Sequence, residues 1–243
     1  MEGPLAALSI PPPPDSGQVL ILITELDPAG NGWQEHSREL PANEQERTHS
    51  YRYAADRFRF AKCRLLLRGV TACWQGISTQ EVAFRHGKNG KPFLVQSLGL
   101  QFNISHTRGC AVLALCHDHE IGIDIEDTGR RTDIDGVAGK VFTRREREML
   151  MQLHKNEKRR HFFRLWTAKE SLMKATGRGF SLNPSSIEAF LPEKPHIPGS
   201  FTCQNLPSAN VLQAREIPVP SGYQAMLCAP AAVLVKSPLI ITV

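Results

Sequence analysis

The segment IGIDIED, at positions 121–127, combines the pattern of a buried strand with two carboxylates. Successive side chains of a strand point to opposite faces, so Asp124 and Glu126 share one face with Gly122. Their Cα atoms are then about 7 Å apart, and both carboxylates can reach one hard cation such as Mg²⁺, which takes oxygen ligands. A half-buried strand with a solvated acidic face has the same pattern, so other residues must decide.

The segment LWTAKESLMK, at 165–174, is typical of a helix with one chemically active face. Trp166, Glu170 and Lys174 are spaced by four residues and therefore lie on the same face. An exposed Glu–Lys pair would contribute only about 0.2–0.5 kcal/mol, but this segment is otherwise apolar. Glu170 could supply a third oxygen to the cation or act as a base, and Lys174 could neutralise a phosphate.

Two further segments carry candidate ligand contacts. In FNISH, at 102–106, strand alternation separates Ser105 from His106, and His106 turns outward if the strand ends at Ser105. In NGKPF, Lys91 lies on a tight turn before a proline. A structural histidine and a solvated hairpin lysine are the ordinary alternatives for these two residues.

Composition limits the class of protein. The chain has 243 residues, 41% of them hydrophobic and 22% charged, and a net charge of +5 that favours an anionic partner. The N-terminus lacks the basic and apolar regions of a secretory signal, and no apolar run reaches the ~18 residues of a membrane helix. With six scattered cysteines and no CxxC pair, we expect a cytoplasmic protein with reduced thiols and no membrane partner. The CHDHE segment has zinc-ligand residue types but lacks a second half, so we interpret it as a turn.

The remaining pattern indicates an α+β chain. Residues 1–17, with four consecutive prolines, are expected to form a flexible tail. A strand near 18–26 precedes a helix from about Asn43 to Val70, closed by Gly69, and then a hairpin and three strands. A helical region follows over 143–179, with Thr143 and Glu146 forming a capping box at its start, and short strands complete the chain.

A faint internal repeat divides the chain into two. FAKCRLL at 60–66 resembles TAKESLM at 167–173, 107 positions later, and EVAF at 81–84 resembles IEAF at 187–190, 106 positions later. The shared order predicts two similar halves, 18–120 and 121–243, with a cleft for a small molecule between them.

The blocks NISH, IGIDIE and WTAKESLMK, in this order, resemble the 4′-phosphopantetheinyl transferase family and its surfactin-synthetase-activating (Sfp-like) group. Asp124 and Glu170 are 46 positions apart (170 − 124), which resembles the family's spacing of roughly forty-odd residues between the two blocks. The GKPF turn and the FFRLW approach to the helix also match. The resemblance covers roughly Asn43 to Phe190.

This resemblance implies a fold, an activity and partners. The family fold is a pseudo-dimer of two α+β halves, each a small, mostly antiparallel sheet packed on a long helix, with coenzyme A between them. Such enzymes transfer the 4′-phosphopantetheine arm of coenzyme A to a serine of apo acyl or peptidyl carrier proteins and release 3′,5′-ADP. An internal pseudo-dimer is expected to act as a monomer, and acidic carrier proteins suit a basic enzyme.

The resemblance also implies roles for individual residues. Trp166 and Lys169 are expected to provide packing and local support. Arg47 matches least well, and a solvated helix arginine is nearly as good an interpretation. The implied Mg²⁺ ligands are Asp124, Glu126 and Glu170; the implied catalytic residues are Glu170 as base and Lys174 at the phosphates; the implied coenzyme A contacts are Arg47, Lys91, Ser105 and His106, with His106 near the 3′-phosphate.

Three other functions are less consistent with the sequence. A different Mg²⁺-dependent phosphotransferase would need a nucleotide cradle, but the chain has no Walker A pattern and no kinase glycine loop. A basic nucleic-acid module would explain KRRHFFR but not the paired acids, and no nucleic-acid motif occurs. An inactive family relative is disfavoured because the acids, the lysine and the histidine are all present.

Overall fold

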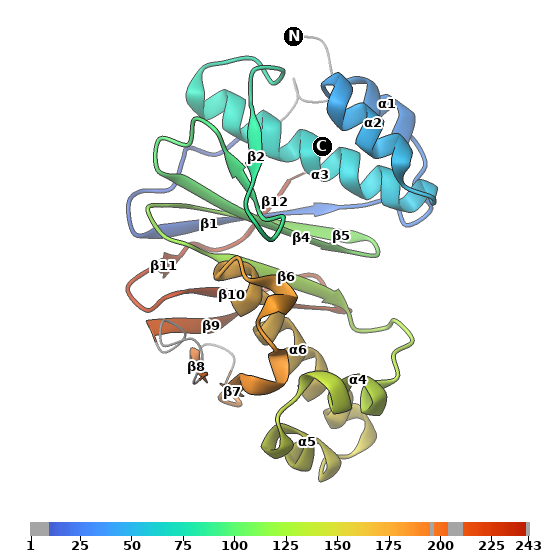
Figure 1. Cartoon of the computed structure of the whole chain (residues 1–243), viewed down its shortest axis with the longest axis vertical. Helices are drawn as coiled ribbons and strands as arrows, with labels where there is room; N and C mark the ends of the chain where they lie inside the picture. Colours follow the sequence, from blue (N-terminus) through green and yellow to red (C-terminus); the bar gives the residue numbers. More distant parts are fainter. Residues whose placement is uncertain (1–9, 195–196, 204–210, 242–243) are drawn as a thin grey trace.

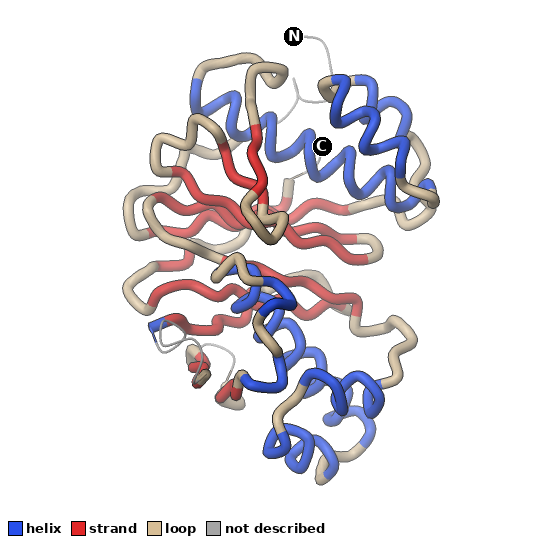
Figure 2. The backbone as a smooth tube through the Cα atoms, in the orientation of Figure 1, coloured by secondary structure: helices blue, strands red, loops and turns tan. Residues whose placement is uncertain are grey.

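The computed structural model describes residues 10–194, 197–203 and 211–241 of the chain. In these ranges two five-stranded sheets pack against each other, and the long helices α3 (Ala54–Gln75) and α6 (Lys155–Ala175) cover their outer faces. Figure 1 shows these layers, with α3 above the first sheet and α6 beneath the second. Figure 2 shows the same arrangement as strands lying between two helical layers.

The first sheet is centred on β1, which pairs with antiparallel β5 on one side and with the short parallel strands β11 and β12 on the other. Antiparallel β4 completes it beside β5. Two short helices and a separate hairpin, β2–β3, belong to the same part of the chain. The bounds are β1 (Gln18–Glu25), α1 (Trp33–Arg38), α2 (Ala42–Ser50), β2 (Phe84–His86), β3 (Pro92–Leu94), β4 (Leu100–Thr107), β5 (Cys110–His117), β11 (Leu234–Val235) and β12 (Leu239–Ile240).

The second sheet is antiparallel, in the order β6-β10-β9-β8-β7, so that β6 lies at one edge. Two short helices precede α6, and two 3₁₀ turns follow it. The bounds are β6 (Gly122–Asp127), α4 (Ile134–Val141), α5 (Arg144–Met151), η2 (Gly179–Ser181), η3 (Pro184–Ser186), β7 (Glu188–Phe190), β8 (Gly199–Thr202), β9 (Leu212–Ile217) and β10 (Tyr223–Pro230).

The apolar run in β1 follows from its position between two layers. Val19, Ile21 and Ile23 pack against the second sheet, whereas Leu20 and Leu22 pack in the cluster that includes α3. A strand covered on both faces needs apolar residues at consecutive positions rather than at alternate ones. The isoleucines of IGIDIED join the inner cluster, which leaves the other face of β6 toward α6. The predicted α+β class is confirmed.

The order of elements repeats along the chain. A strand (β1), a helical region ending in a long helix (α1–α3) and four strands (β2–β5) are followed by a strand (β6), a second such region (α4–α6) and four strands (β7–β10). Strand pairing repeats as well, because β1 pairs with β5 and β5 with β4, while β6 pairs with β10 and β10 with β9.

Both predicted long helices are divided. The helix expected from Asn43 to Val70 is α2 and α3, separated at 51–53, where the flanking residues Tyr51 and Tyr53 have extended backbones. It does not end at Gly69: α3 continues to Gln75, with Gly76 as a left-handed cap at φ 65°. The capping box of Thr143 and Glu146 is confirmed, but it starts the short helix α5, and α6 begins separately at Lys155.

Residues 1–9 of the predicted flexible tail lie outside the described residues. The described part of that segment contacts the helical layer: Ile10 packs on the cluster of the first sheet and α3, and the Trp74 indole N–H donates to the Pro11 carbonyl at 2.8 Å. Among the described residues, no helix is long and apolar enough to cross a membrane.

Candidate active site

The face of β6 that bears the two acids lies directly against α6. Gly122 makes this close approach possible, since a Cβ there would lie 2.1 Å from the Ser171 carbonyl oxygen and 2.3 Å from the Ala175 nitrogen. Only a residue without a side chain permits such a contact between strand and helix backbones. Asp124 and Glu126 follow Gly122 on the same face, as predicted from strand alternation.

The predicted face of α6 meets these acids. The Lys174 ammonium lies 2.7 Å from Asp124 Oδ1, and the Trp166 indole N–H donates to Glu126 Oε1 at 2.8 Å. Arg130, in the loop after β6, also donates to Glu126 Oε1, at 3.1 Å. Two residues eight positions apart along α6 thus contact two residues two positions apart along β6.

Glu170 lies between these two contacts along α6, and the charges of both acids of β6 act on it. Burial, then the negative charges of Asp124 and Glu126, raise the pKa of Glu170 to about 7, although Lys174 acts in the opposite direction. Burial and the charge of Asp124 also raise the pKa of Glu126, against the effects of Arg130, Trp166 and Lys174. A carboxyl group with a pKa near neutrality can accept and release a proton under ordinary conditions.

Two oxygens of this cluster are buried without a hydrogen-bond partner: Asp124 Oδ2 and Glu170 Oε1. Buried polar atoms in folded proteins are nearly always satisfied, so each such atom needs an explanation. Unpaired carboxylate oxygens are the donor type that a hard cation takes, and the donor chemistry therefore fits Mg²⁺. In the part of the chain that the structure describes, no group of three or more His, Cys, Asp and Glu side chains is arranged to hold a metal ion.

Ser105 lies at the centre of the site rather than at its edge. Its hydroxyl is 2.9 Å from Asp124 Oδ1 and 2.8 Å from the Lys174 ammonium, and it accepts from the Ile125 amide at 3.3 Å. The side chain is buried, with 5% of its surface exposed. The structure thus brings together Ser105, Asp124 and Lys174 from β4, β6 and α6.

His106 points away from this group, because β4 continues to Thr107 and alternation still applies at His106. The residue is exposed at the surface. Desolvation by the surrounding protein, followed by the positive charges of Arg59 and Lys174, nevertheless lowers the pKa of its imidazole to about 4. Its ring is therefore neutral near neutral pH.

Lys91 and Asn89 link the β2–β3 hairpin to the end of α6. The Lys91 ammonium donates to the carbonyls of Ala175, at 3.0 Å, and Ile121, at 3.4 Å. The Asn89 side-chain amide donates to the Gly177 carbonyl at 2.9 Å. Cations and side-chain donors at a helix C-terminus satisfy its last carbonyls, so this hairpin tip fastens the first half of the chain to α6.

Arg47 is on α2, where its guanidinium lies 3.4 Å from the His86 imidazole and over the Phe60 ring at 5.1 Å. These contacts are separate from the ones that join Ser105, Asp124 and Lys174. Arg47 is thus the predicted site residue that the structure's contacts tie least to the acids.

The support role expected for Lys169 has a clear geometry. Its ammonium, 2% exposed, donates to Glu146 Oε2 at 2.5 Å and to the carbonyls of Val141 and Pro184 at 3.1 and 3.0 Å. Glu146 in turn accepts from the amide of Ala189 at 2.9 Å. This buried pair fastens α5, η3 and β7 around α6 next to Glu170.

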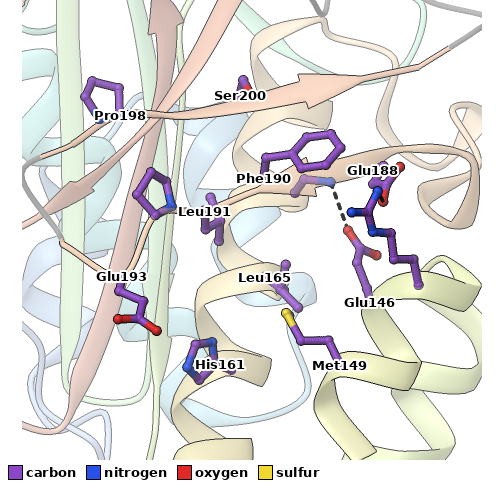
Figure 3. Close-up of a pocket in the computed structure, with 13 residues that line it drawn as sticks. Glu146, Met149, His161, Leu165, Glu188, Phe190, Leu191, Glu193, Pro198 and Ser200 are labelled. Carbon is purple, nitrogen blue, oxygen red and sulfur yellow. Dashed lines mark hydrogen bonds and ion pairs between the residues drawn. The ribbon is translucent and has the colours of Figure 1, made fainter. Parts of the chain in front are cut away.

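A pocket of about 600 Å³ lies at a different place, between α5, α6 and the strands β7 and β8. Figure 3 shows Met149 and Leu165 below Phe190 and Leu191, and its dashed line starts at Glu146, which accepts a hydrogen bond from the Ala189 amide. Because neither the acids of β6 nor Lys174 line it, this pocket is not the candidate active site.

Sequence reasoning missed two features of the site. It placed Trp166 as packing, whereas its N–H holds Glu126, and it did not single out Arg130. The spacing of Trp166 and Glu170 carried the signal for the first contact. Nothing in the sequence pattern indicates the second, because the loop after β6 has no periodicity.

Comparisons with known proteins show the family of the chain. A model of the 4′-phosphopantetheinyl transferase superfamily matches residues 120–228, and a model of a 4′-phosphopantetheinyl transferase N-terminal family matches residues 24–118. The 4′-phosphopantetheinyl transferase HetI of a Nostoc species is 32% identical over 193 residues, covering 76% of this chain and 81% of that protein. The 4′-phosphopantetheinyl transferase Sfp of Bacillus subtilis is 27% identical over 190 residues, covering 78% and 82%.

A solved structure, the holo-[acyl-carrier-protein] synthase of Thermotoga maritima, aligns with a TM-score of 0.36 at 14% identity, covering 46% of this chain and 62% of that one. From the sequence matches, the chain belongs to the 4′-phosphopantetheinyl transferase superfamily, with Sfp-like relatives. It is an enzyme of the phosphopantetheinyl transferase type.

Proposed function

We propose that the enzyme transfers the 4′-phosphopantetheine arm of coenzyme A to a serine hydroxyl of apo acyl or peptidyl carrier proteins, giving the holo carrier and 3′,5′-ADP. One observation carries the proposal: Asp124 and Glu126 of β6 face Glu170 and Lys174 of α6 across a backbone contact that Gly122 permits. Acids and a lysine in this arrangement are better explained as a site for a pyrophosphate substrate than as an ordinary solvated face of the protein.

The proposed reaction is a displacement at phosphorus. The serine oxygen bonds to the phosphorus that carries the pantetheine arm, and the bond from that phosphorus to the bridging oxygen breaks. The bridging oxygen keeps the electron pair and leaves with 3′,5′-ADP. Glu170 accepts the serine proton, directly or through a water that it orients. Lys174 offsets the charge that develops on the phosphate oxygens.

Magnesium is part of the proposal, with Asp124, Glu126 and Glu170 as its donors, although these three side chains are not already arranged as a metal-ligand group in the described residues. The unpartnered buried oxygens Asp124 Oδ2 and Glu170 Oε1 support this role, and three neighbouring acids otherwise repel one another and the pyrophosphate. When bound, the ion supplies charge neutralisation and orientation at the pyrophosphate.

Coenzyme A is proposed to bind beside this group. His106 lies near its 3′-phosphate, and Lys91 and Arg47 contribute positive charge. The Lys91 ammonium has three N–H donors, of which two go to the carbonyls of Ala175 and Ile121. The third can serve the ligand. Arg47 is the weakest of these assignments, given its contacts with His86 and Phe60.

The proposed architecture is a pseudo-dimer of two similar halves, 18–120 and 121–243, with coenzyme A between them. Its support is the repeated order of strand, helices and four strands, and the two family matches, of which one ends at 118 and the other begins at 120. The C-terminal strands β11 and β12 cross back to pair with β1, so the halves share one sheet. We expect a monomer in solution and acidic carrier proteins as partners, in keeping with the net charge of +5.

The decisive test is the mass of a purified apo acyl carrier protein after incubation with the enzyme, coenzyme A and Mg²⁺. We expect the carrier to gain one phosphopantetheine arm, and EDTA or the Asp124→Ala variant to prevent the gain. No gain on several fatty-acid and peptide-synthetase carriers, with coenzyme A and Mg²⁺ both present, would contradict the proposal. A gain that EDTA leaves unchanged would contradict the metal alone.

A further inference from the structure

The polar side chains of β4 hold the free edge of β6. Asn103 Oδ1 accepts from the Ile123 amide at 2.8 Å, and two positions later Ser105 Oγ accepts from the Ile125 amide at 3.3 Å. A third such bond, of 3.2 Å, joins Thr107 to the Asp127 amide. The two residues of each bond are 20 positions apart in the sequence. Alternate side chains of β4 thus satisfy alternate backbone amides of β6, which has no strand partner on this side of its sheet.

Ser105 differs from its two neighbours in this row. Asn103 and Thr107 bond the β6 backbone, whereas the Ser105 hydroxyl also bonds Asp124, at 2.9 Å, and Lys174, at 2.8 Å. Ser105 therefore belongs both to the row of side chains that bonds the β6 backbone and to the group formed with Asp124 and Lys174.

The hydrogen-bonding capacity of this hydroxyl is full. A serine hydroxyl has one donor hydrogen and two acceptor lone pairs. The Ile125 amide and the Lys174 ammonium occupy the lone pairs, and the hydrogen goes to Asp124 Oδ1. The residue is also 5% exposed. Nothing remains of the Ser105 side chain with which to bind coenzyme A.

We propose that Ser105 is a positioning residue, whose hydroxyl fixes the Asp124 carboxylate and the Lys174 ammonium relative to β6 and does not contact coenzyme A. The proposal rests on the function proposed above, and it replaces the coenzyme A contact that the sequence suggested. Asp124 Oδ2 has no hydrogen-bond partner, so the bonds to Oδ1 from Ser105 and Lys174 are the ones that restrain this carboxylate. Loss of the hydroxyl frees it to rotate, which should slow the chemical step more than it weakens binding.

The test compares Ser105→Ala with Ser105→Thr, which keeps the hydroxyl, and with Thr107→Val, which removes a β6 amide acceptor away from the acids. We expect Ser105→Ala to lower kcat about 10- to 100-fold, with the KM for coenzyme A and its calorimetric Kd changed less than about twofold. Ser105→Thr should retain most of kcat, and Thr107→Val should match the wild type. A Kd raised about tenfold or more with kcat intact would overturn the proposal, as would an equal loss of kcat in Thr107→Val.

A second measurement does not depend on transfer. Thermal unfolding of Ser105→Ala, Asp124→Asn and the double variant reports whether the two side chains are coupled. We expect the double variant to lose clearly less in Tm than the sum of the single losses. Additive losses would overturn the positioning role. If the wild type neither transfers the arm nor binds coenzyme A, the proposed function fails, while this coupling still decides the role of Ser105.

Discussion

The Lys174 ammonium lies 2.7 Å from Asp124 Oδ1, across the contact between α6 and β6. The Asp124 side chain is 6% exposed and that of Lys174 is 29% exposed, so the pair lies at the boundary between the protein interior and solvent. Lys174 thereby offsets one of the negative charges that β6 and Glu170 bring together. Removing one partner of a pair at this depth leaves the other charge uncompensated, and the partly exposed ammonium can also face an anionic substrate.

Lys174→Met is expected to reduce both the stability of the protein and its transfer activity. Asp124 then loses its cationic partner and keeps only Ser105, and leaving a buried acceptor without its partner costs about 1–3 kcal/mol in free energy of unfolding. Transfer should fall about 100-fold or more, because a positive charge at the phosphates is lost. Denaturant unfolding and carrier-protein mass measure the two effects.

Lys158→Met is the matched control. Lys158 is also on α6, but its partner Asp135 is 76% exposed. Exposed pairs contribute about 0–1 kcal/mol, so stability and transfer should both stay near those of the wild type. Equal losses of stability and transfer in Lys174→Met and Lys158→Met would show that the ion pair of Lys174 with Asp124 has no special role.

Glu170→Gln should stabilise the protein at neutral and higher pH in the presence of EDTA. Burial and the charges of Asp124 and Glu126, partly offset by Lys174, raise the pKa of Glu170 from 4.5 to about 7. The stability that the protonated group provides is therefore complete below pH 4.5 and is lost as the pH rises through about 7. Glutamine lacks this dependence, so the Tm difference between variant and wild type should grow over that interval.

Thermal unfolding between about pH 4 and pH 8 measures this difference. Glu148→Gln, at an exposed position of α5 paired with Arg144, serves as the control and should show no such growth. Added Mg²⁺ should raise the Tm of the wild type more than that of Glu170→Gln, because the glutamine removes one proposed donor. A Tm difference that stays constant with pH would show that Glu170 is not held in this charged environment.

Much of this site could be predicted from the sequence, because it depends on short-range periodicity. The alternation in IGIDIED places the acids opposite the isoleucine face, and the four-residue spacing in α6 places Trp166, Glu170 and Lys174 together. Gly122 belongs to the same pattern. Its role as the point where helix and strand backbones touch needs the tertiary structure, because a glycine in a strand also suits a bulge.

The part that could not be predicted depends on partners far apart in the chain. Ser105 is 69 residues from Lys174, and Asn89 is 88 residues from Gly177. A side chain's partners determine whether it contacts a ligand or fastens the fold, and no local pattern encodes them. The same holds for the breaks in the two helical regions, where residues 51–53 and 152–154 look helix-compatible but are not helical.

Gly122→Ala should damage the site without changing any of its polar groups. An added Cβ would lie 2.1 Å from the Ser171 carbonyl oxygen, so α6 must move away from β6. Overpacking of this kind costs about 1–3 kcal/mol or more, and the displacement also separates Lys174 from Asp124. We expect lower stability together with a large loss of transfer.

Gly139→Ala, in α4, is the opposite case. A Cβ there meets no atom within 4 Å, and alanine favours a helix over glycine by about 1 kcal/mol. This variant should be as stable as the wild type or more stable, with normal transfer. If Gly122→Ala behaved in the same way, the close approach of β6 and α6 would not be required for the site.

His106 should change its protonation when coenzyme A binds. Without coenzyme A, desolvation by the surrounding protein and the charges of Arg59 and Lys174 lower the pKa of the His106 imidazole to about 4. A phosphate dianion placed beside the ring favours the charged form and must raise this pKa. An NMR titration of the imidazole, assigned with His106→Gln, should show an upward shift of about one unit or more with coenzyme A.

Dephospho-coenzyme A provides the control for this assignment, because it lacks the 3′-phosphate and keeps the pyrophosphate and the pantetheine arm. It should leave the pKa of His106 close to that of the free protein. An equal shift with both ligands would place the imidazole near the pyrophosphate instead. Since the bound dianion favours the protonated ring, coenzyme A should also bind more tightly as the pH falls toward the raised pKa, and His106→Ala should abolish that dependence.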